Sequence, residues 1–323
     1  MPPALAGGSF DDAIARPGPR PGRTTAHASR VVDMAQFRVA APRTLDEAFS
    51  LLPIQDRDVK LVAGGTDVLI HIRAGKSAPK RLVLLSKISE LDDDIRVTDT
   101  GIRIGALARL SDVVRHPVVL ARFTALAEAA AQIGSEQIRN RGTVCGNVAN
   151  ASPAGDTLPP LYVFDAVVNL IGPNGRRAVP IAAFVQAPGR TDLAAGELIE
   201  SIVCPFPPDG AGSGYIKLAR RAGIDISTVG AAAMVCDADT VRLALGAVGP
   251  TPIRPLAAEP LLGAGLRDDE AFDRGITAAA EATTPISDIR ASRDYRLAMV
   301  QVMAREAIRL SQQRSTSKDR VQA

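Results

Sequence analysis

The chain has 323 residues, enough for one large domain or two ordinary ones, and its 46% apolar and 23% charged residues are normal for a globular protein. Its 38 basic and 35 acidic residues leave a net charge of only +3, no dense Lys/Arg block is present, and Trp is absent, so the surface of a nucleic-acid-binding protein is not expected. No run of about 18 apolar residues predicts a membrane span.

The first 33 residues are rich in Pro, Gly, Ala and Arg and predict a disordered extension over residues 1–33. They lack the apolar stretch of a secretory signal. A clean globular pattern opens at Met34, which is consistent with Met34 as the true start of the protein.

The cysteines and histidines predict neither a disulfide framework nor a metal site. Cys145, Cys204 and Cys236 are widely spaced and form no Cys-x-x-Cys pair, so we expect reduced thiols packed as small hydrophobic side chains in a cytoplasmic protein. An iron–sulfur cluster held by this chain alone is not expected. The three histidines lack the helical spacing of metal ligands.

The first elements alternate short helices with buried strands. Thr44–Glu47 has the pattern of a capping box and predicts a short helix that ends near Pro53. Residues 59–63 are apolar and β-branched and stop at a glycine pair, which predicts a buried strand. A short helix or turn is expected over residues 66–73, and a second buried strand over 82–85.

A hairpin and two helices are expected next. Apolar residues alternate on both arms of residues 95–104 around a turn-forming centre, which predicts a hairpin. Ser111 is expected to cap a helical turn that stops before Pro117. Residues 117–133 predict one longer helix, with Gly134 as its C-terminal stop.

The later chain predicts strands and turns, and then helices. A turn is expected at Pro173–Gly175, and the Pro- and Gly-rich residues 205–214 mark a boundary or a long loop. The mixture predicts an α+β fold, not a strict βαβ winding. The expected strands are 198–206, 215–218, 228–235 and 241–245, and the expected helices are 268–282 and 293–313, with frayed residues from Ser315.

Two loops carry small residues at unusual density. The first loop is Ala63-Gly64-Gly65-Thr66-Asp67, and the second loop is Thr143-Val144-Cys145-Gly146-Asn147, preceded by Gly142 and followed by a polar stretch that ends at Asp156. Glycines let the backbone approach a ligand closely, and successive free N–H groups form a nest for anions. Either loop alone could be only a turn, but two such loops facing each other would suit a pyrophosphate.

Other phosphate and nucleophile motifs are missing. The sequence contains no Gly-x-Gly-x-x-Gly that opens a helix after a strand, no Gly-x-x-x-x-Gly-Lys-Ser/Thr and no Gly-x-Ser-x-Gly. The chain therefore offers phosphate binding with little acid–base machinery, which fits a bound cofactor that supplies its own chemistry.

The two loops, within a longer set of segments, resemble the FAD-binding subunit of the xanthine dehydrogenase and carbon monoxide dehydrogenase family. The second loop and its flanks are the most specific part of the match. The resemblance covers Met34 to Leu310 in the expected order, and its segments are residues 63–67, 137–156, 217–221 with 225–227, 249–254 and 287–296.

The resemblance implies an FAD-binding domain of the vanillyl-alcohol-oxidase (PCMH) type, made of two α/β subdomains, over residues 34–209. A C-terminal flavoprotein domain would follow over 210–314, with a frayed tail over 315–323. It also implies two partners, a small subunit with two [2Fe–2S] clusters and a large subunit with molybdopterin, in a dimer of heterotrimers. Electrons would pass from the clusters through FAD to NAD or another acceptor.

Carried over by position, the first and second loops would hold the pyrophosphate of FAD. Asp156 would lie near the ribityl chain or the flavin, Ile226 would face the isoalloxazine ring, and Lys217 lies on the strand that leads there. From the residues alone, Asp156 could instead cap the helix before Leu158, and Lys217 could belong to a solvated basic turn with its neighbouring arginines.

Three features qualify this resemblance. Cys145 stands where the family commonly has glycine, so its side chain either crowds the second loop or packs away from it. Asp67 is ordinary at its position. The Cys-rich insertion with which some relatives bind a [4Fe–4S] cluster is absent between Asn147 and Asp156, so this chain should carry flavin only.

Two other functions remain open at this level. A stand-alone FAD-dependent oxidase of the same fold would need a substrate-covering domain and a base near the flavin. A non-enzymatic phosphate-binding module would carry no flavin absorption band. The substrate of the holoenzyme would belong to the large subunit and is not specified by this sequence.

Overall fold

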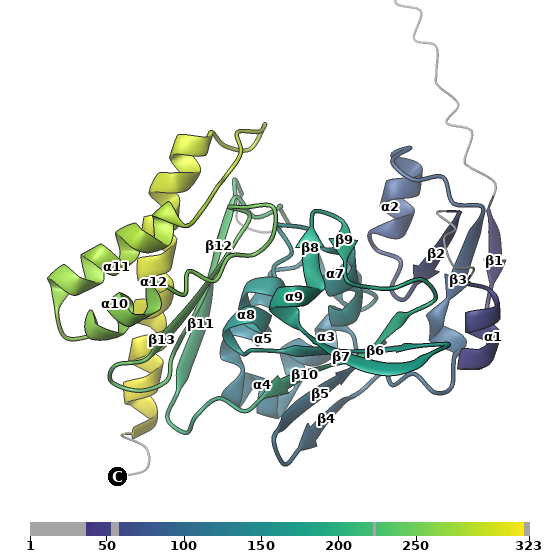
Figure 1. Cartoon of the computed structure of the whole chain (residues 1–323), viewed down its shortest axis with the longest axis horizontal. Coiled ribbons are helices and arrows are strands. Elements are labelled where there is room, and N and C mark those ends of the chain that lie inside the picture. The colour runs from purple at the N-terminus through teal and green to yellow at the C-terminus, as the bar shows by residue number, and fades with distance from the viewer. Residues whose placement is uncertain (1–36, 53–57, 222–223, 320–323) are drawn as a thin grey trace, which may run out of the picture. The chain divides into compact units, whose positions relative to one another are not determined.

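The computed structural model describes residues 37–52, 58–221 and 224–319. The expected extension over residues 1–33 and the expected helix end near Pro53 lie outside these residues. The described chain forms an N-terminal part from β1 to β10 and a C-terminal part from β11 to α12 (Figure 1).

The N-terminal part opens with a parallel three-stranded sheet in the order β1-β3-β2. The strands are β1 (Arg38–Ala40), β2 (Val59–Val62) and β3 (Arg81–Leu84), and the helices α1 (Leu45–Ser50) and α2 (Val68–Arg73) connect them. A short 3-10 turn, η1 (Leu85–Lys87), follows β3.

Successive residues of β2 serve opposite faces of this sheet, as the alternation of side chains along a strand requires. Leu61 packs with the cluster that includes Leu45 of α1, whereas Val62 packs with Ile72 of α2. The expected cap of α1 is confirmed, because Thr44 Oγ1 accepts a hydrogen bond from the N–H of Glu47 at 3.2 Å.

A five-stranded antiparallel sheet in the order β4-β5-β10-β6-β7 completes the N-terminal part. The expected hairpin is confirmed, because β4 and β5 pair from Thr98↔Gly101 outward, and β6 and β7 meet at Gly172↔Gly175 around the expected turn. The strands are β4 (Ile95–Thr98), β5 (Gly101–Gly105), β6 (Val167–Gly172), β7 (Gly175–Pro180) and β10 (Leu198–Pro205), with a small pair β8 (Val185–Ala187) and β9 (Arg190–Thr191) beside them.

The helices of this part differ from expectation at residues 117–133, at Ser111 and at the second loop, whose residues 144–147 begin a helix. The single helix expected over residues 117–133 is wrong, because Phe123 leaves helical geometry at φ −124° and ψ 44° and buries its ring against Phe164, 5.0 Å away between ring centroids. Ser111 is not the cap of its helix, which starts one residue after Arg109. The helices are α3 (Leu110–Arg115), α4 (Pro117–Arg122), α5 (Thr124–Ala131), α6 (Glu136–Arg139), α7 (Val144–Asn150), α8 (Leu158–Val163) and α9 (Ile181–Phe184).

The C-terminal part is an antiparallel sheet, β11-β12-β13, with three helices. α12 packs across β11 and β12 on one face, and α5 and α8 of the N-terminal part lie against the same sheet. The central strand is covered on both faces, which explains its unbroken apolar run. The elements are β11 (Gly212–Leu218), β12 (Val229–Val235), β13 (Val241–Gly246), α10 (Glu259–Ala264), α11 (Asp269–Glu281) and α12 (Arg293–Asp319).

The last helix carries the expected apolar stripe. Val300, Ala304 and Ile308 are fully buried. The helix was expected to end at Gln313, with frayed residues from Ser315, but it continues to Asp319.

Candidate functional site

The first loop links β2 to α2 and touches the start of the second. A Cβ at Gly64 would lie 2.1 Å from the carbonyl oxygen of Arg141 and 2.9 Å from the Cα of Gly142, so only glycine allows this approach. Gly65 has a positive φ of 76°, which favours glycine. The glycine pair is therefore required by a close backbone contact and by a left-handed turn.

The second loop is the start of α7, and its shape is set locally. Thr143 is the N-cap, and its Oγ1 accepts a hydrogen bond from the N–H of Gly146 at 2.9 Å. A Cβ at Gly142 would lie 3.5 Å from Oγ1 of Thr66 in the first loop. The structure thus brings the two loops side by side, as a shared pyrophosphate would need.

Backbone donors gather where these loops meet. Among the residues that the structure describes, no acceptor is present for the N–H groups of Gly64, Gly65 and Thr66. Because α7 begins at Val144, the N–H groups of Val144 and Cys145 have no acceptor within the helix. The amides of residues 64–66, beside a glycine where no Cβ would fit, are suited to the diphosphate of a dinucleotide.

The side chain of Cys145 points away from this junction, which answers the question that its position raised. It is 3% exposed within the main core, and its thiol donates to the carbonyl oxygen of Gly105 at 3.6 Å. Burial raises the pKa of Cys145 to about 12. Cysteine therefore replaces glycine here without crowding the loop, and only its backbone faces the junction.

Asp156 is not a helix cap. The cap position of α8 is Thr157, and the Asp156 carboxylate instead accepts hydrogen bonds from Tyr215 Oη at 2.7 Å, from Lys217 Nζ at 2.8 Å and from the Ser227 hydroxyl. Burial, together with the charge of Asp156, raises the pKa of Tyr215 well above its ordinary value, so this phenol stays protonated and donates.

Lys217 is buried rather than part of a solvated turn. Its side chain is 4% exposed, and its Nζ also donates to the carbonyl oxygen of Gln132 at 3.2 Å. Its neighbours Arg220 and Arg221 do lie at the surface, as a solvated turn predicts. Both are exposed, and their Nε atoms lie 3.6 and 3.7 Å from a carboxylate oxygen of Asp225. No sequence pattern distinguishes the lysine from the two arginines.

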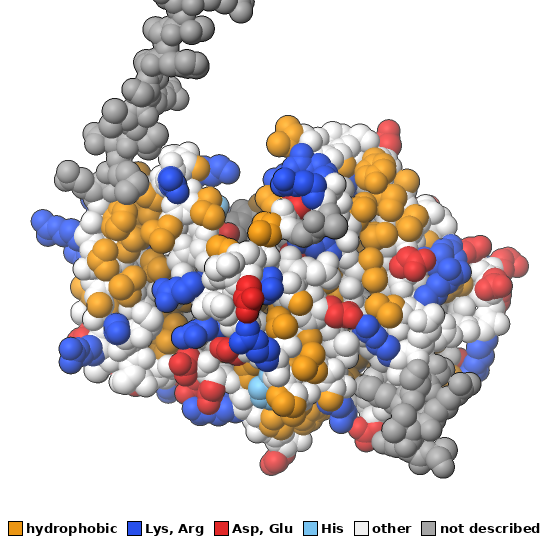
Figure 2. All heavy atoms as spheres, turned by 180° about the vertical axis from the view of Figure 1, so that it is seen from behind, with side chains coloured by type: hydrophobic (Ala, Val, Ile, Leu, Met, Phe, Trp, Pro, Cys, Tyr) orange, Lys and Arg blue, Asp and Glu red, His pale blue; other side chains and the backbone are white. Residues whose placement is uncertain are grey.

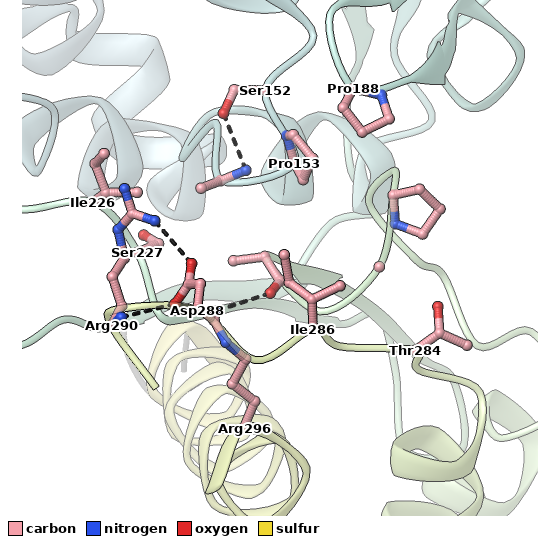
Figure 3. A pocket seen from close by; sticks show the side chains of 14 residues that line it. Ser152, Pro153, Pro188, Ile226, Ser227, Thr284, Ile286, Asp288, Arg290 and Arg296 are labelled. Carbon is pink, nitrogen blue, oxygen red and sulfur yellow. Dashed lines mark hydrogen bonds and ion pairs between the residues drawn. The ribbon is translucent and has the colours of Figure 1, made fainter. Parts of the chain in front are cut away.

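Ile226 stands half-exposed at a cavity of about 380 Å³ between the two parts of the chain. Figure 3 shows Ile226 and Ser227 near Ser152 and Pro153, which follow the second loop. The cavity thus joins the end of the second loop to the C-terminal part.

The cavity is also lined by an ion-pair cluster that the sequence reasoning did not assign to the site. Asp288 accepts from Arg290 Nη1 at 2.8 Å and from Arg296 Nη2 at 2.8 Å (Figure 3). Arg296 also donates from Nη1 to the carbonyl oxygen of Ala247 at 3.1 Å. Residues 287–296 are one of the segments that resemble the family, and this resemblance is the feature of the sequence that points to the cluster.

The predicted site residues therefore fall into two groups. One is the pair of loops, and the other is Asp156, Lys217 and the Ile226 segment. A hydrogen bond of 2.6 Å from Thr157 Oγ1 to Asn147 Oδ1 connects the groups, because Asn147 belongs to the second loop and Thr157 follows Asp156.

In Figure 2, basic and acidic side chains are scattered among one another, in agreement with the small net charge. No helix in the described part of the chain is long and apolar enough to cross a membrane. Among the same residues, no group of three or more His, Cys, Asp or Glu side chains could hold a metal ion.

Comparison with known proteins gives matches to both parts of the chain. Residues 35–207 match the family described as the FAD binding domain in molybdopterin dehydrogenase, and residues 214–310 match the CO dehydrogenase flavoprotein C-terminal domain. The chain is 34% identical over 277 residues to the carbon monoxide dehydrogenase medium chain of Hydrogenophaga pseudoflava, covering 84% of this chain and 96% of that one.

Two further relatives agree. The xanthine dehydrogenase FAD-binding subunit of Escherichia coli O157:H7 is 32% identical over 282 residues, covering 85% of this chain and 95% of the relative. The solved carbon monoxide dehydrogenase from Hydrogenophaga pseudoflava, in a form that lacks the Mo-pyranopterin moiety of its cofactor, matches with a TM-score of 0.82 and 35% identity, over 86% of this chain and 98% of that chain.

Proposed function

Because the chain belongs to the family of FAD-binding subunits of xanthine dehydrogenase and carbon monoxide dehydrogenase type, we propose that it takes electrons from the [2Fe–2S] clusters of a partner subunit and passes them through FAD to NAD or another acceptor. The partners in this proposal are a small iron–sulfur subunit and a large molybdopterin subunit, in a dimer of heterotrimers. The cytoplasm fits the three free, buried cysteines.

One observation carries the proposal, which is the contact of the two loops at Gly64. We propose that the amides of residues 64–66 and 144–145 donate to the diphosphate of FAD, with Ala63, Asp67 and Gly146 completing the turns. Any side chain at Gly64 would overlap the Arg141 carbonyl and would push the two loops apart. When bound, FAD can accept electrons one at a time and release them as a pair.

The remaining predicted residues are proposed to surround the flavin end of the cofactor. The Asn147 side chain uses Oδ1 for Thr157, which leaves its amide N–H₂ to face the ligand. Asp156 and Lys217 would place a buried, paired charge near the ring system, and Ile226 would give it an apolar face. The protein's tasks are thus to hold, orient and partly cover the cofactor.

The comparisons favour a subunit over the stand-alone oxidase. The match to a xanthine dehydrogenase FAD-binding subunit spans 85% of this chain and 95% of the relative, which leaves no room in that relative for a large substrate-covering domain. A purely phosphate-binding module would not need the segments after residue 214, which also match a flavoprotein domain.

The test is the flavin content of a double variant, Gly65→Trp with Asn147→Ala. We expect the wild-type protein to carry FAD in a 1:1 ratio at most, and the double variant to be colourless, because an indole at position 65 would crowd Val62 and Leu69 and distort the first loop, and because an amide donor is lost. Gly75→Trp is the matched control, since Gly75 also has a positive φ, of 69°, but has nothing within 4 Å of its Cβ position. A double variant that stays yellow, with FAD released on denaturation, would contradict the proposal.

A further inference from the structure

The carboxylate of Asp156 is bonded across the boundary between the two parts of the chain. Asp156 lies just before α8 in the N-terminal part, whereas its three donors lie on β11 or just before β12. Oδ1 accepts from Tyr215 and Ser227, and Oδ2 accepts from Lys217. We call Asp156, Tyr215, Lys217 and Ser227 the latch.

Lys217 makes this connection stronger because it also bonds the end of α5. Its Nζ reaches the carbonyl oxygen of Gln132, so one buried ammonium joins two separate segments of the N-terminal part to β11. The side chains of Lys217 and Asp156 are only 4% and 8% exposed. A pair this deeply buried is stable only while both charges are present, since either charge alone would be left without compensation.

Other charges close to the latch are themselves paired. Glu128 accepts from the backbone N–H of Tyr215 at 2.9 Å and also pairs with Arg314 of α12. The latch is therefore a closed, neutral unit.

Ser227 extends the latch to the cavity. Its hydroxyl bonds the Asp156 carboxylate, and the preceding residue, Ile226, stands half-exposed among the cavity-lining residues. Ser152 and Pro153 line the same cavity from the segment that leads to Asp156. The position of Ile226 relative to that segment is thus fixed through one carboxylate.

We propose that Lys217 is a positioning residue that acts through Asp156. The ion pair holds the segment after the second loop against β11, and the Ser227 hydrogen bond to the same carboxylate fixes Ile226 at the cavity. The effect on a flavin rests on the proposed function, whereas the latch itself is a contact within the protein. This role differs from that of a residue that only binds FAD, because replacing such a residue would leave the FAD-free protein unaffected.

The first experiment therefore measures thermal unfolding of the FAD-free full-length chain. We expect Lys217→Met to lower the unfolding temperature by roughly 5 °C or more, because Asp156 is left buried and unpaired. The double variant Asp156→Asn with Lys217→Met removes both charges and should recover at least half of that loss. An unchanged unfolding temperature in Lys217→Met, or a double variant as unstable as the single one, would overturn the proposal.

The second experiment follows the flavin in the FAD-loaded chain. Ser227→Ala removes one donor from the carboxylate and leaves the ion pair in place, so we expect a folded yellow protein whose flavin reduction potential is lower than in the wild type, because the negative charge of Asp156 is less neutralised. Thr284→Val is the matched control, since Thr284 lines the same cavity outside the latch, and it should keep the wild-type potential. Equal potentials in Ser227→Ala and the wild type would overturn the coupling of the latch to the flavin.

The two experiments separate the inference from the proposed function. A wild-type chain that never binds FAD would refute the function, while the pattern of FAD-free unfolding temperatures would still support the latch. The opposite result is a wild type that binds FAD and a Lys217→Met variant whose affinity for FAD falls tenfold while its stability without FAD is unchanged. That result would support direct binding of FAD by Lys217 and would overturn the latch.

Discussion

The two halves of the candidate site are built in different ways. The loop junction consists of backbone atoms and small residues, and its decisive contact is between Gly64 and the Arg141 carbonyl. The latch and the neighbouring Asp288 cluster consist of charged and hydroxyl side chains, and the latch joins segments far apart, since Lys217 and Asp156 are 61 positions apart. The first half is therefore sensitive to a side chain added at Gly64, and the second to the loss of one partner of its ion pairs.

This difference determines what each half can do. Backbone amides are held in place by the turns themselves, so they form a preorganised anion site without a costly buried charge. A buried carboxylate needs every donor around it, but in return it ties together segments that the backbone does not connect. The proposed phosphate binding would thus depend on local geometry, whereas the alignment of the two parts depends on long-range pairing.

The largest effect is expected from Gly64→Val, which tests the backbone half. Its Cβ would overlap the Arg141 carbonyl, so the loops must separate at a cost of about 3 kcal/mol or more in the free energy of unfolding. FAD should be lost completely. Flavin absorbance would report the loss of FAD, and urea unfolding would report the loss of stability. Wild-type stability with full FAD content in this variant would break the comparison, because the close contact would then be unnecessary.

A smaller effect is expected from Asp288→Asn, which tests the side-chain half. Burial by itself raises the pKa of Asp288, but the N–H of Arg290 and the Arg296 guanidinium outweigh it and hold this pKa well below its ordinary value. We expect a loss of about 2 kcal/mol at pH 7.

The stability that Asp288 contributes should change with pH, and the direction of the change follows from its lowered pKa. A carboxylate whose pKa is lowered by folding contributes stability above its unfolded pKa of about 3.9, and this contribution is lost as the pH falls through the folded value. The difference in the free energy of unfolding between wild type and Asp288→Asn, measured with urea, should therefore be largest near pH 7 and should shrink below about pH 4. A gap that stays constant down to pH 2 would mean that the charge of Asp288 has no role.

The smallest effect is expected from Cys145→Ala, in the backbone half. The thiol packs in the core and away from the junction, so its loss should cost only about 1 kcal/mol in stability and should leave FAD binding unchanged. Because burial raises its pKa to about 12, the native thiol should also resist alkylation at pH 8. Loss of FAD in this variant would show that the second loop depends on a side chain after all.

The same contrast explains how far the sequence could be interpreted. The hairpin around Asp99, the cap at Thr44 and the two glycine loops follow from local patterns, and the structure contains all of them. The break at Phe123 did not follow, because it depends on a ring packing against Phe164, 41 positions later in the chain. Local periodicity cannot report such a contact.

The site shows the same division. Thr143 is expected from the sequence only as a loop residue, whereas in the structure it is the N-cap of α7, and its partner Gly146 is three positions away. The burial of Lys217 could not be distinguished from the exposure of Arg221, because only the folded sheet places Asp156 and Gln132 beside the lysine. Side chains whose partners are distant in the sequence are the ones that sequence patterns describe least well.

The most direct measurement is a crystal structure of the chain with FAD bound. We predict that the diphosphate oxygens lie within hydrogen-bond distance of the amides of Gly64, Gly65 and Val144, at the junction of the two loops. A diphosphate bound anywhere else on the protein, with those amides in contact only with water, would contradict the central claim.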